Sequence, residues 1–142
     1  MTTLWRSTAP LAALSLAPYN TEYSKFTIHN QADHIMGKVI ELTDSNFDAI
    51  VLQAGRPVLV DFWSPQCGPC RLLVPTLDSL AEEYNEDCVI AKYNVFDGSA
   101  IPARYGVEIL PTLLFFSQGN VVQRLVGVHP REKLQDVLDS IE

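Results

Sequence analysis

The sequence predicts an α/β domain built on a central mixed β-sheet with helices on both faces. Two observations carry this prediction. Short apolar runs typical of buried strands alternate with segments whose apolar residues recur at helical spacing, which calls for parallel crossovers. The last two strand-like runs are joined by a short turn, so the sheet also has an antiparallel edge. The length of 142 residues suits a single hydrophobic core.

The first three elements follow from their patterns. Residues 39–42 form a short strand, and Asp44 or Ser45 can cap a helix whose apolar positions repeat at helical spacing until Gly55 ends it. The run 57–63 is almost wholly apolar, β-branched or aromatic, which is typical of a strand buried on both faces of a sheet. One acid interrupts this strand.

The middle of the chain predicts a helix and a second central strand. The helix begins in the segment that holds Cys67 and Cys70 and runs to about Tyr84. We expect Pro75 to kink it, because proline removes a helical donor and clashes with the preceding turn. Residues 88–93 are predicted to form the second central strand.

A short helix, a hairpin and a closing helix complete the predicted domain. The short helix covers 99–105, and the hairpin pairs 111–116 with 121–126 across the turn 118–120. Pro130 opens the final helix at its first turn, where a missing N–H donor costs nothing.

The first 36 residues differ from the rest in composition and period. They hold two basic and two acidic residues, so the whole net charge of −7 falls on residues 37–142. We expect 1–36 to be a mobile or loosely packed N-terminal extension and 37–142 to be the folded domain. The extension makes a poor secretory signal, and its acid-poor, Ser/Thr-bearing start also fits an organelle transit segment. The expected location is the cytoplasm, with an organelle as the alternative.

Charge and hydropathy exclude some classes of partner. A net charge of −7 repels nucleic-acid phosphates, so we expect no nucleic acid partner. No apolar run approaches the roughly 20 residues that a bilayer span requires, so we expect no membrane span. The chain is expected to be a monomer.

Cys67 and Cys70 form the motif that carries chemistry. At this spacing the two sulfurs lie one helical turn apart, close enough to form a reversible disulfide. Cys67 lies at the helix N-terminus, where free N–H groups and the helix dipole favour its thiolate, so we predict that it attacks and that Cys70 resolves. Gly68 and Pro69 keep the link short. The alternative is half a zinc site, but the other Cys and His residues are scattered; we expect no metal and no organic cofactor.

These cysteines and their neighbours resemble the thioredoxin family. The motifs that carry the resemblance are Val60-Asp-Phe-Trp63, Cys67-Gly-Pro-Cys70-Arg71, Ala91-Lys92-Tyr-Asn94, Tyr105-Gly-Val107, Leu110-Pro-Thr112 and Gly119. They cover roughly 39–141 in the order and spacing of the family. The resemblance implies the thioredoxin fold and a protein-disulfide reductase. It also implies two kinds of partner, thioredoxin reductase or an equivalent electron donor and disulfide-containing target proteins.

The resemblance also implies a role for Asp61. Burial disfavours the charged form of a carboxyl group and raises its pKa, so such a group can exchange protons near neutral pH. The family places the matching acid beneath the cysteines, which implies that Asp61 is a general acid/base for Cys70 and that Lys92 moderates it. The alternative is a structural carboxylate satisfied by Lys92 or by backbone donors.

A substrate surface is implied as well. Leu110 and Pro111 resemble the cis-proline turn that faces the cysteines in the family. The expected surface comprises Trp63, Gln66, Gly68, Pro69, Leu110, Pro111, Thr112 and Gly127. For Trp63 the alternative is core filling, and for Gly127 a plain turn. Gln66 departs from the family, which usually has Trp directly before the first cysteine, and this change puts the choice of partners in question.

The residues alone do not exclude two other functions. One is a thiol oxidase or isomerase of an oxidising compartment, which would use the same cysteines at a higher potential. The other is a non-catalytic binding subunit, for which Gln66 is the only hint. The Gly-Pro pair between the cysteines matches the reducing members of the superfamily. Cys88 is interpreted as a small apolar core residue, with a regulatory thiol as the alternative.

Overall fold

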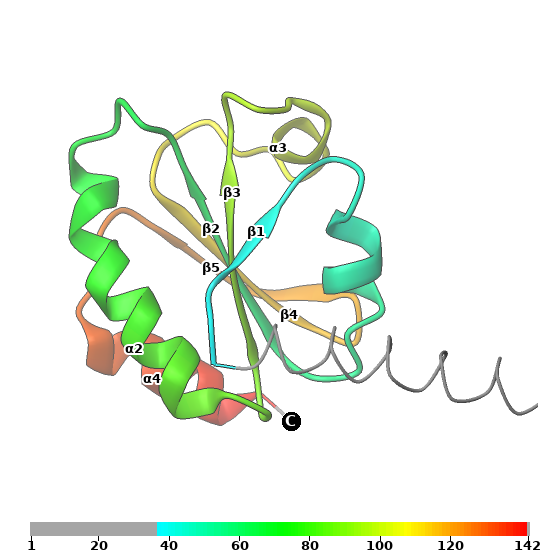
Figure 1. The fold of residues 1–142 in the computed structure, drawn as a ribbon, viewed down its shortest axis with the longest axis vertical. Coiled ribbons are helices and arrows are strands. Elements are labelled where there is room, and N and C mark those ends of the chain that lie inside the picture. The colour runs from blue at the N-terminus through cyan, green and yellow to red at the C-terminus, as the bar shows by residue number, and fades with distance from the viewer. Residues whose placement is uncertain (1–36, 142) are drawn as a thin grey trace, which may run out of the picture. The chain divides into compact units, whose positions relative to one another are not determined.

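The computed structural model describes residues 37–141, which form one mixed five-stranded sheet. Its strands are β1 (Ile40–Leu42), β2 (Val58–Trp63), β3 (Val89–Asn94), β4 (Thr112–Ser117) and β5 (Asn120–Val126). Their order across the sheet is β1-β3-β2-β4-β5 (Figure 1). The first three run parallel, and β4 and β5 are antiparallel to their neighbours. The predicted mixed sheet is confirmed. The predicted extension over 1–36 lies outside the described residues.

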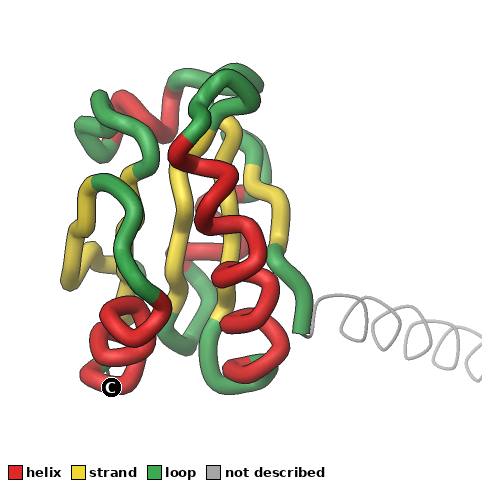
Figure 2. The backbone as a smooth tube through the Cα atoms, turned by 90° about the vertical axis from the view of Figure 1, so that its left-hand side faces the viewer, coloured by secondary structure: helices red, strands yellow, loops and turns green. Residues whose placement is uncertain are grey.

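Helices cover both faces of the sheet, as predicted. They are η1, a π-helix (Asp48–Leu52), η2, a 3-10 helix (Pro69–Leu73), α2 (Val74–Tyr84), α3 (Ala100–Arg104) and α4 (Arg131–Ser140). Helices α2 and α4 lie on one face, whereas η1 and α3 lie on the other (Figure 1). Figure 2 shows α2 and α4 in front of the strands.

Each face of the sheet has its own hydrophobic layer. The layer under η1 and α3 includes Phe47, Phe62, Tyr93, Ile101 and Phe116. The layer under α2 and α4 includes Leu59, Leu77, Leu80, Leu134 and Leu138. Because side chains alternate along a strand, Leu59 of β2 points toward α2, and Asp61, two residues on, shares that side. The acid in the central strand therefore lies under the helix that carries the cysteines.

The first predicted helix differs from the structure. Helical structure is confined largely to η1, and neither Asp44 nor Ser45 caps it. The Asp44 carboxylate instead accepts hydrogen bonds from the hydroxyl of Tyr93 and, at 3.3 Å, from the N–H of Ile101 in α3. A carboxylate used by tertiary partners in this way is not available to the N–H groups of its own helix.

The expected kink at Pro75 falls where the helix changes type. The helix that follows the cysteines starts as η2 and becomes α-helical at Val74, so Pro75 lies in the first turn of α2. The N–H groups of a first turn have no intrahelical acceptor, and proline costs nothing there. Pro75 is therefore accommodated at the start of α2.

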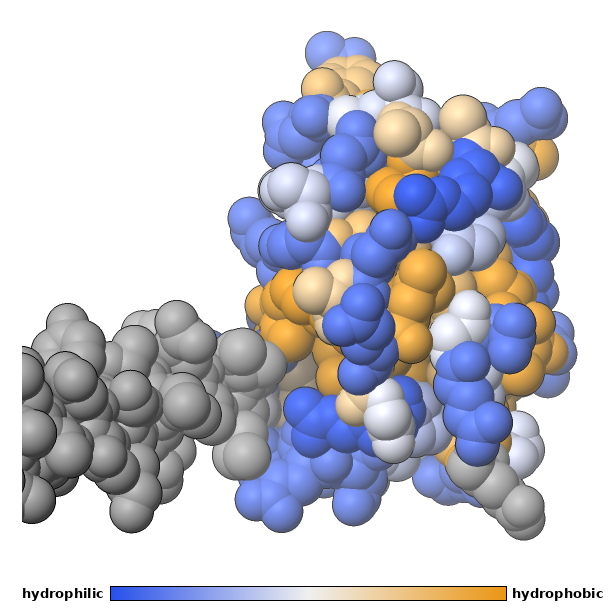
Figure 3. All heavy atoms as spheres, turned by 90° about the vertical axis from the view of Figure 1, so that its right-hand side faces the viewer, coloured by the Kyte–Doolittle hydropathy of each residue, from blue (hydrophilic) through white to orange (hydrophobic). Residues whose placement is uncertain are grey.

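One face of the domain can be followed by its hydropathy. The face on the right of Figure 1, drawn in Figure 3, is mostly hydrophilic and divides its apolar area into small patches. Within residues 37–141, no helix is long and apolar enough to cross a membrane.

Candidate active site

A disulfide joins Cys67 and Cys70 where β2 gives way to η2. The S–S distance is 2.08 Å and the two Cα atoms lie 5.4 Å apart. Cys67 is half-buried, whereas Cys70 is only 3% exposed. The N–H of Cys70 also donates to Cys67 Sγ over 3.2 Å, a contact that favours negative charge on this sulfur once the disulfide is open. The two sulfurs therefore differ in access and in environment.

Backbone contacts hold the loop that presents the disulfide. The N–H of Cys67 donates to the carbonyl oxygen of Ser64 over 3.1 Å, and the Arg71 guanidinium donates to that of Pro65 over 3.2 Å. Gly68 and Pro69 are exposed between the cysteines. Hydrogen bonds thus hold this short loop in place, and the more accessible of its two sulfurs is that of Cys67.

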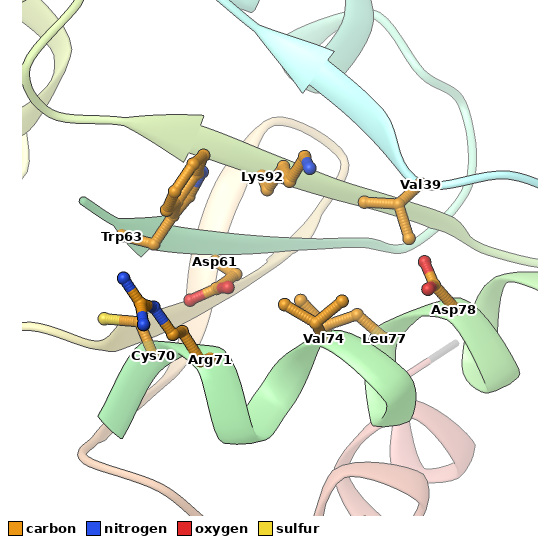
Figure 4. Close-up of a pocket in the computed structure, with 9 residues that line it drawn as sticks. All are labelled: Val39, Asp61, Trp63, Cys70, Arg71, Val74, Leu77, Asp78 and Lys92. Carbon is orange, nitrogen blue, oxygen red and sulfur yellow. The ribbon is translucent and has the colours of Figure 1, made fainter. Parts of the chain in front are cut away.

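Asp61 is buried beneath the disulfide. It is 3% exposed, and its Oδ1 makes no hydrogen bond to any residue in the described part of the chain. Burial raises the pKa of its carboxyl group to about 7, and the positive charge of Lys92 offsets part of this rise. Figure 4 shows the carboxylate directed toward Cys70 inside a cavity of about 70 Å³ that both residues line. A carboxyl group in this state can exchange a proton near neutral pH.

The positive charge of Lys92, the residue expected to moderate Asp61, lowers the pKa of that carboxyl group. Its ion pair, however, is with Glu41, whose Oε1 lies 3.2 Å from Lys92 Nζ. Asp61 Oδ1 has no hydrogen-bond partner in the described part of the chain, so neither Lys92 nor a backbone donor satisfies this oxygen. Sequence reasoning missed Glu41. Its signal was an acid between two apolar residues of the first strand.

The predicted cis peptide bond is present between Leu110 and Pro111. Thr112, which follows, pairs with Phe62 of β2 on one side and with Val126 of β5 on the other. The turn therefore lies at the end of the sheet where β2 leads into the cysteine loop. The N–H of Gly127 donates to the Pro111 carbonyl oxygen over 2.8 Å and so joins the two turns at this end.

The residues predicted to form the substrate surface differ in exposure. Gln66, Gly68 and Pro69 are exposed, Trp63, Leu110 and Gly127 are half-buried, and Pro111 and Thr112 are buried. The hydroxyl of Thr112 donates to the backbone carbonyl of Ile109, so this side chain supports the turn from inside and does not reach solvent. Sequence reasoning missed two apolar neighbours, Ile109 and Val128, which are 62% and 42% exposed. Their signal was an apolar residue beside each of the two turns.

Two further residues, Trp63 and Cys88, lie at the cavity and in the core respectively. The Trp63 ring packs against the Lys92 ammonium, which lies 5.4 Å from the ring centroid, and both residues line the cavity above Asp61. Cys88 is buried directly before β3 in the layer under α2, where burial raises the pKa of its thiol to about 11. Among residues 37–141, no group of three or more His, Cys, Asp or Glu side chains could hold a metal ion.

The comparisons with known proteins agree on one family. The sequence matches the family model described as thioredoxin over residues 38–140. It is 40% identical to a thioredoxin of Haemophilus influenzae over 105 residues, which cover 74% of this chain and 98% of that protein. It is 41% identical to a thioredoxin of Porphyra purpurea over 102 residues, 72% of this chain and 95% of that protein. It is 38% identical to thioredoxin 1 of Synechococcus elongatus over 105 residues, 74% of this chain and 98% of that protein.

Proposed function

Because this chain belongs to the thioredoxin family and is therefore a protein-disulfide reductase that works by dithiol–disulfide exchange, we propose a role for each residue of its site. Cys67 is the nucleophile and Cys70 the resolving thiol. The observation that carries this assignment is the difference in access, since Cys67 is half-buried and Cys70 is 3% exposed. An incoming disulfide can reach only the first sulfur without a rearrangement of the loop.

The exchange proceeds in two displacements. The Cys67 thiolate attacks one sulfur of a target disulfide, forms a mixed disulfide and releases the other sulfur as a thiolate. The Cys70 thiolate then attacks Cys67 Sγ, which releases the second target sulfur. The target gains two electrons and becomes a dithiol, and the Cys67–Cys70 disulfide seen in the structure is the product. An external donor must reduce it before the next cycle.

Asp61 is the general base that accepts the proton of Cys70 before the second displacement, directly or through water. Its burial, its position in the cavity that Cys70 also lines, and a pKa raised to about 7 support this role. Lys92 is the cation that tempers the rise in the pKa of Asp61. We expect Asp61→Asn to slow release of the reduced target at pH 7 by at least about tenfold.

Target proteins dock on the exposed rim of the site. Gln66, Gly68 and Pro69 form one side of this rim, and Leu110 and Gly127, with Ile109 and Val128, form the other. Trp63, Pro111 and Thr112 lie deeper and shape the rim from below. The apolar side chains of Ile109 and Val128 provide the contact area that a protein target can bury.

The partners and the compartment follow from the activity. The electron donor is thioredoxin reductase or an equivalent, and the targets are disulfide-containing proteins. The domain acts as a monomer without nucleic acid. A dithiol donor of this kind suits a reducing compartment, which is the cytoplasm or, if residues 1–36 are a transit segment, an organelle.

Trapping of the mixed disulfide tests the assignment. We expect Cys70→Ser to accumulate a covalent complex with a disulfide substrate protein and Cys67→Ser to form none and to lose activity, whereas Cys88→Ala should keep full activity as the matched control. Non-reducing electrophoresis and a turnover assay provide the readouts. Full activity of Cys67→Ser, or trapping through Cys70 in its place, would contradict the proposal.

A further inference from the structure

Three charged residues lie side by side across three strands. Glu41 of β1 is in register with Lys92 of β3, and Lys92 is in register with Asp61 of β2. Residues in register send their side chains to the same face of a sheet, here the face that α2 covers. The row reads negative, positive, negative, so one ammonium group has a carboxylate on either side. We call these three residues the charge row.

We propose that Glu41 is a positioning residue that holds the Lys92 ammonium on the β1 side of the charge row, so that the carboxyl group of Asp61 stays unpaired and free to exchange a proton with Cys70. This inference rests on the proposed role of Asp61 and adds to it the residue that keeps Asp61 available. Glu41 itself does not contact the cysteines or the cavity that Asp61 and Cys70 line.

The position of Lys92 carries the argument. Its Nζ lies 3.2 Å from Glu41 Oε1 and 5.4 Å from the centroid of the Trp63 ring, so the ammonium is held between a carboxylate and an aromatic face. In Figure 4 its side chain extends along the sheet toward β1, whereas the Asp61 carboxylate points the other way, toward Cys70. Lys92 nevertheless lines the same cavity as Asp61, so Asp61 is its second available partner.

Burial explains why the position of one ammonium matters. The side chains of Lys92 and Glu41 are 30% and 78% exposed, so their ion pair keeps the ammonium in contact with water. A bond to Asp61 would bring the ammonium to a carboxyl group that is 3% exposed, where an opposite charge strongly favours the ionised acid. An exposed ion pair is weak and is screened by salt, so the hold of Glu41 on Lys92 should be modest and should decrease at high ionic strength.

Among the charged residues around Asp61, Lys92 is the cation that affects the pKa of its carboxyl group. From η2 the cavity is lined by Arg71 and Cys70, and from α2 by Asp78. The Arg71 guanidinium donates to the carbonyl oxygen of Pro65, and it is Lys92 whose charge lowers the pKa of Asp61. From β4 the residue in register with Asp61 is Leu113, which carries no charge.

Titration of Asp61 in a double-mutant cycle tests the proposal. The carboxyl carbon of Asp61 is followed by NMR from pH 4 to pH 10 in the full-length oxidised chain, where Cys67 and Cys70 cannot titrate. We expect Glu41→Gln to lower the apparent pKa of Asp61 by about half a unit to one unit, because Lys92 turns toward Asp61, and Lys92→Gln to raise it. In the Lys92→Gln background, Glu41→Gln should leave the titration unchanged.

Three outcomes overturn the positioning role. One is an unchanged titration of Asp61 in Glu41→Gln, and another is a rise. The third is an equal fall with and without Lys92, because it would mean that Glu41 acts by its own charge and not by holding Lys92. Glu132→Gln, an exposed change of the same charge on α4, is the control and should not move the titration. The difference between Glu41→Gln and wild type should shrink from 0.05 to 1 M salt.

A rate measurement separates this inference from the proposed function. Release of reduced target from the mixed disulfide is timed between pH 5 and pH 9 for the wild type, Glu41→Gln and Asp61→Asn. If Asp61→Asn releases target as fast as the wild type, the proposed role of Asp61 fails, and the charge row no longer serves catalysis even if Glu41 holds Lys92. If Asp61→Asn is slow but Glu41→Gln leaves both titration and pH profile unchanged, only the role of Glu41 fails. Both stand if the pH profile of Glu41→Gln shifts downward together with its titration.

Discussion

Gly127 donates its backbone N–H to the carbonyl oxygen of Pro111 over 2.8 Å, and this bond joins the turn after β5 to the cis peptide bond before β4. The next pair inward, Thr112 with Val126, belongs to the β4–β5 ladder, so the bond extends the ladder beyond the strands. This bond therefore fixes the positions of the two turns that border the cysteine loop relative to each other. Backbone contacts thus build this side of the proposed docking rim.

Substitution of Gly127 should cost stability. Its φ is +89°, a conformation that side-chain-bearing residues rarely adopt, although an added Cβ would meet no atom within 4 Å. We expect Gly127→Ala to lower the free energy of unfolding by about 1 to 2 kcal/mol through backbone strain alone. Urea unfolding of the oxidised chain measures it. Gly68→Ala, at a helical φ of −59°, is the matched control and should be neutral or slightly stabilising. Equal effects at the two glycines would contradict the backbone argument.

The buried carboxyl group of Asp61 should make stability fall as pH rises. The pKa of Asp61 is raised from 3.8 to about 7 in the folded domain, so well below pH 4 both states hold the proton and ionisation of Asp61 does not affect stability. Between pH 4 and pH 7 Asp61 ionises in the unfolded chain but stays protonated in the folded domain. The free energy of unfolding therefore falls by up to roughly 4 kcal/mol across this range. Asp61→Asn removes this penalty, so its stability relative to the wild type should increase from pH 4 to pH 8.

Unfolding in urea at pH 4, 6 and 8 measures this difference. The oxidised chain is used so that the two catalytic thiols do not titrate. Val74→Ala, a change at the same cavity that removes no titrating group, is the control, and its difference from wild type should be the same at each pH. A constant difference for Asp61→Asn as well would mean that the carboxyl group titrates normally in the folded domain.

Cys88 should be unreactive until the domain unfolds. It is 6% exposed, and burial raises the pKa of its thiol from 9.0 to about 11. We expect the oxidised chain to react with an aromatic disulfide reagent at least about 100-fold more slowly when folded than in urea, since the thiolate is the reacting form. Cys88→Ala sets the background of the assay. Rapid labelling of one thiol in the folded chain would favour the regulatory interpretation.

Gln66 should set the affinity for protein targets without changing the chemistry. It is exposed directly before Cys67, where its amide offers a polar contact. We expect Gln66→Trp to lower KM for a disulfide-containing protein by roughly fivefold, because a Trp ring at an interface contributes about 1 kcal/mol. Reduction of a small-molecule disulfide should be unaffected. Gln66→Ala is the control, and an equal change with both substrates would place the effect at Cys67 instead.

Local patterns determined most of the fold and the reactive pair. The run 57–63 predicts a central strand, and the structure has β2 there, because a buried strand requires contiguous apolar residues whatever its neighbours are. Cys67 and Cys70 are three residues apart, so helical geometry alone brings their sulfurs within bonding reach. Helix type was harder to predict. A 3-10 helix precedes α2 and η1 is a π-helix, because packing of a short segment decides between hydrogen-bond patterns of similar energy.

The tertiary structure alone decided which groups meet. The sequence by itself determined that Asp61 lies in a buried strand and that Lys92 lies in the next one, and it allowed the two to pair. Register across three strands added Glu41, 51 residues before Lys92 in the chain, and Lys92 pairs with it. In the same way Asp44 serves Tyr93 and not its own helix. Which of two partners a charged side chain keeps depends on strand register and on burial, and no local pattern contains either.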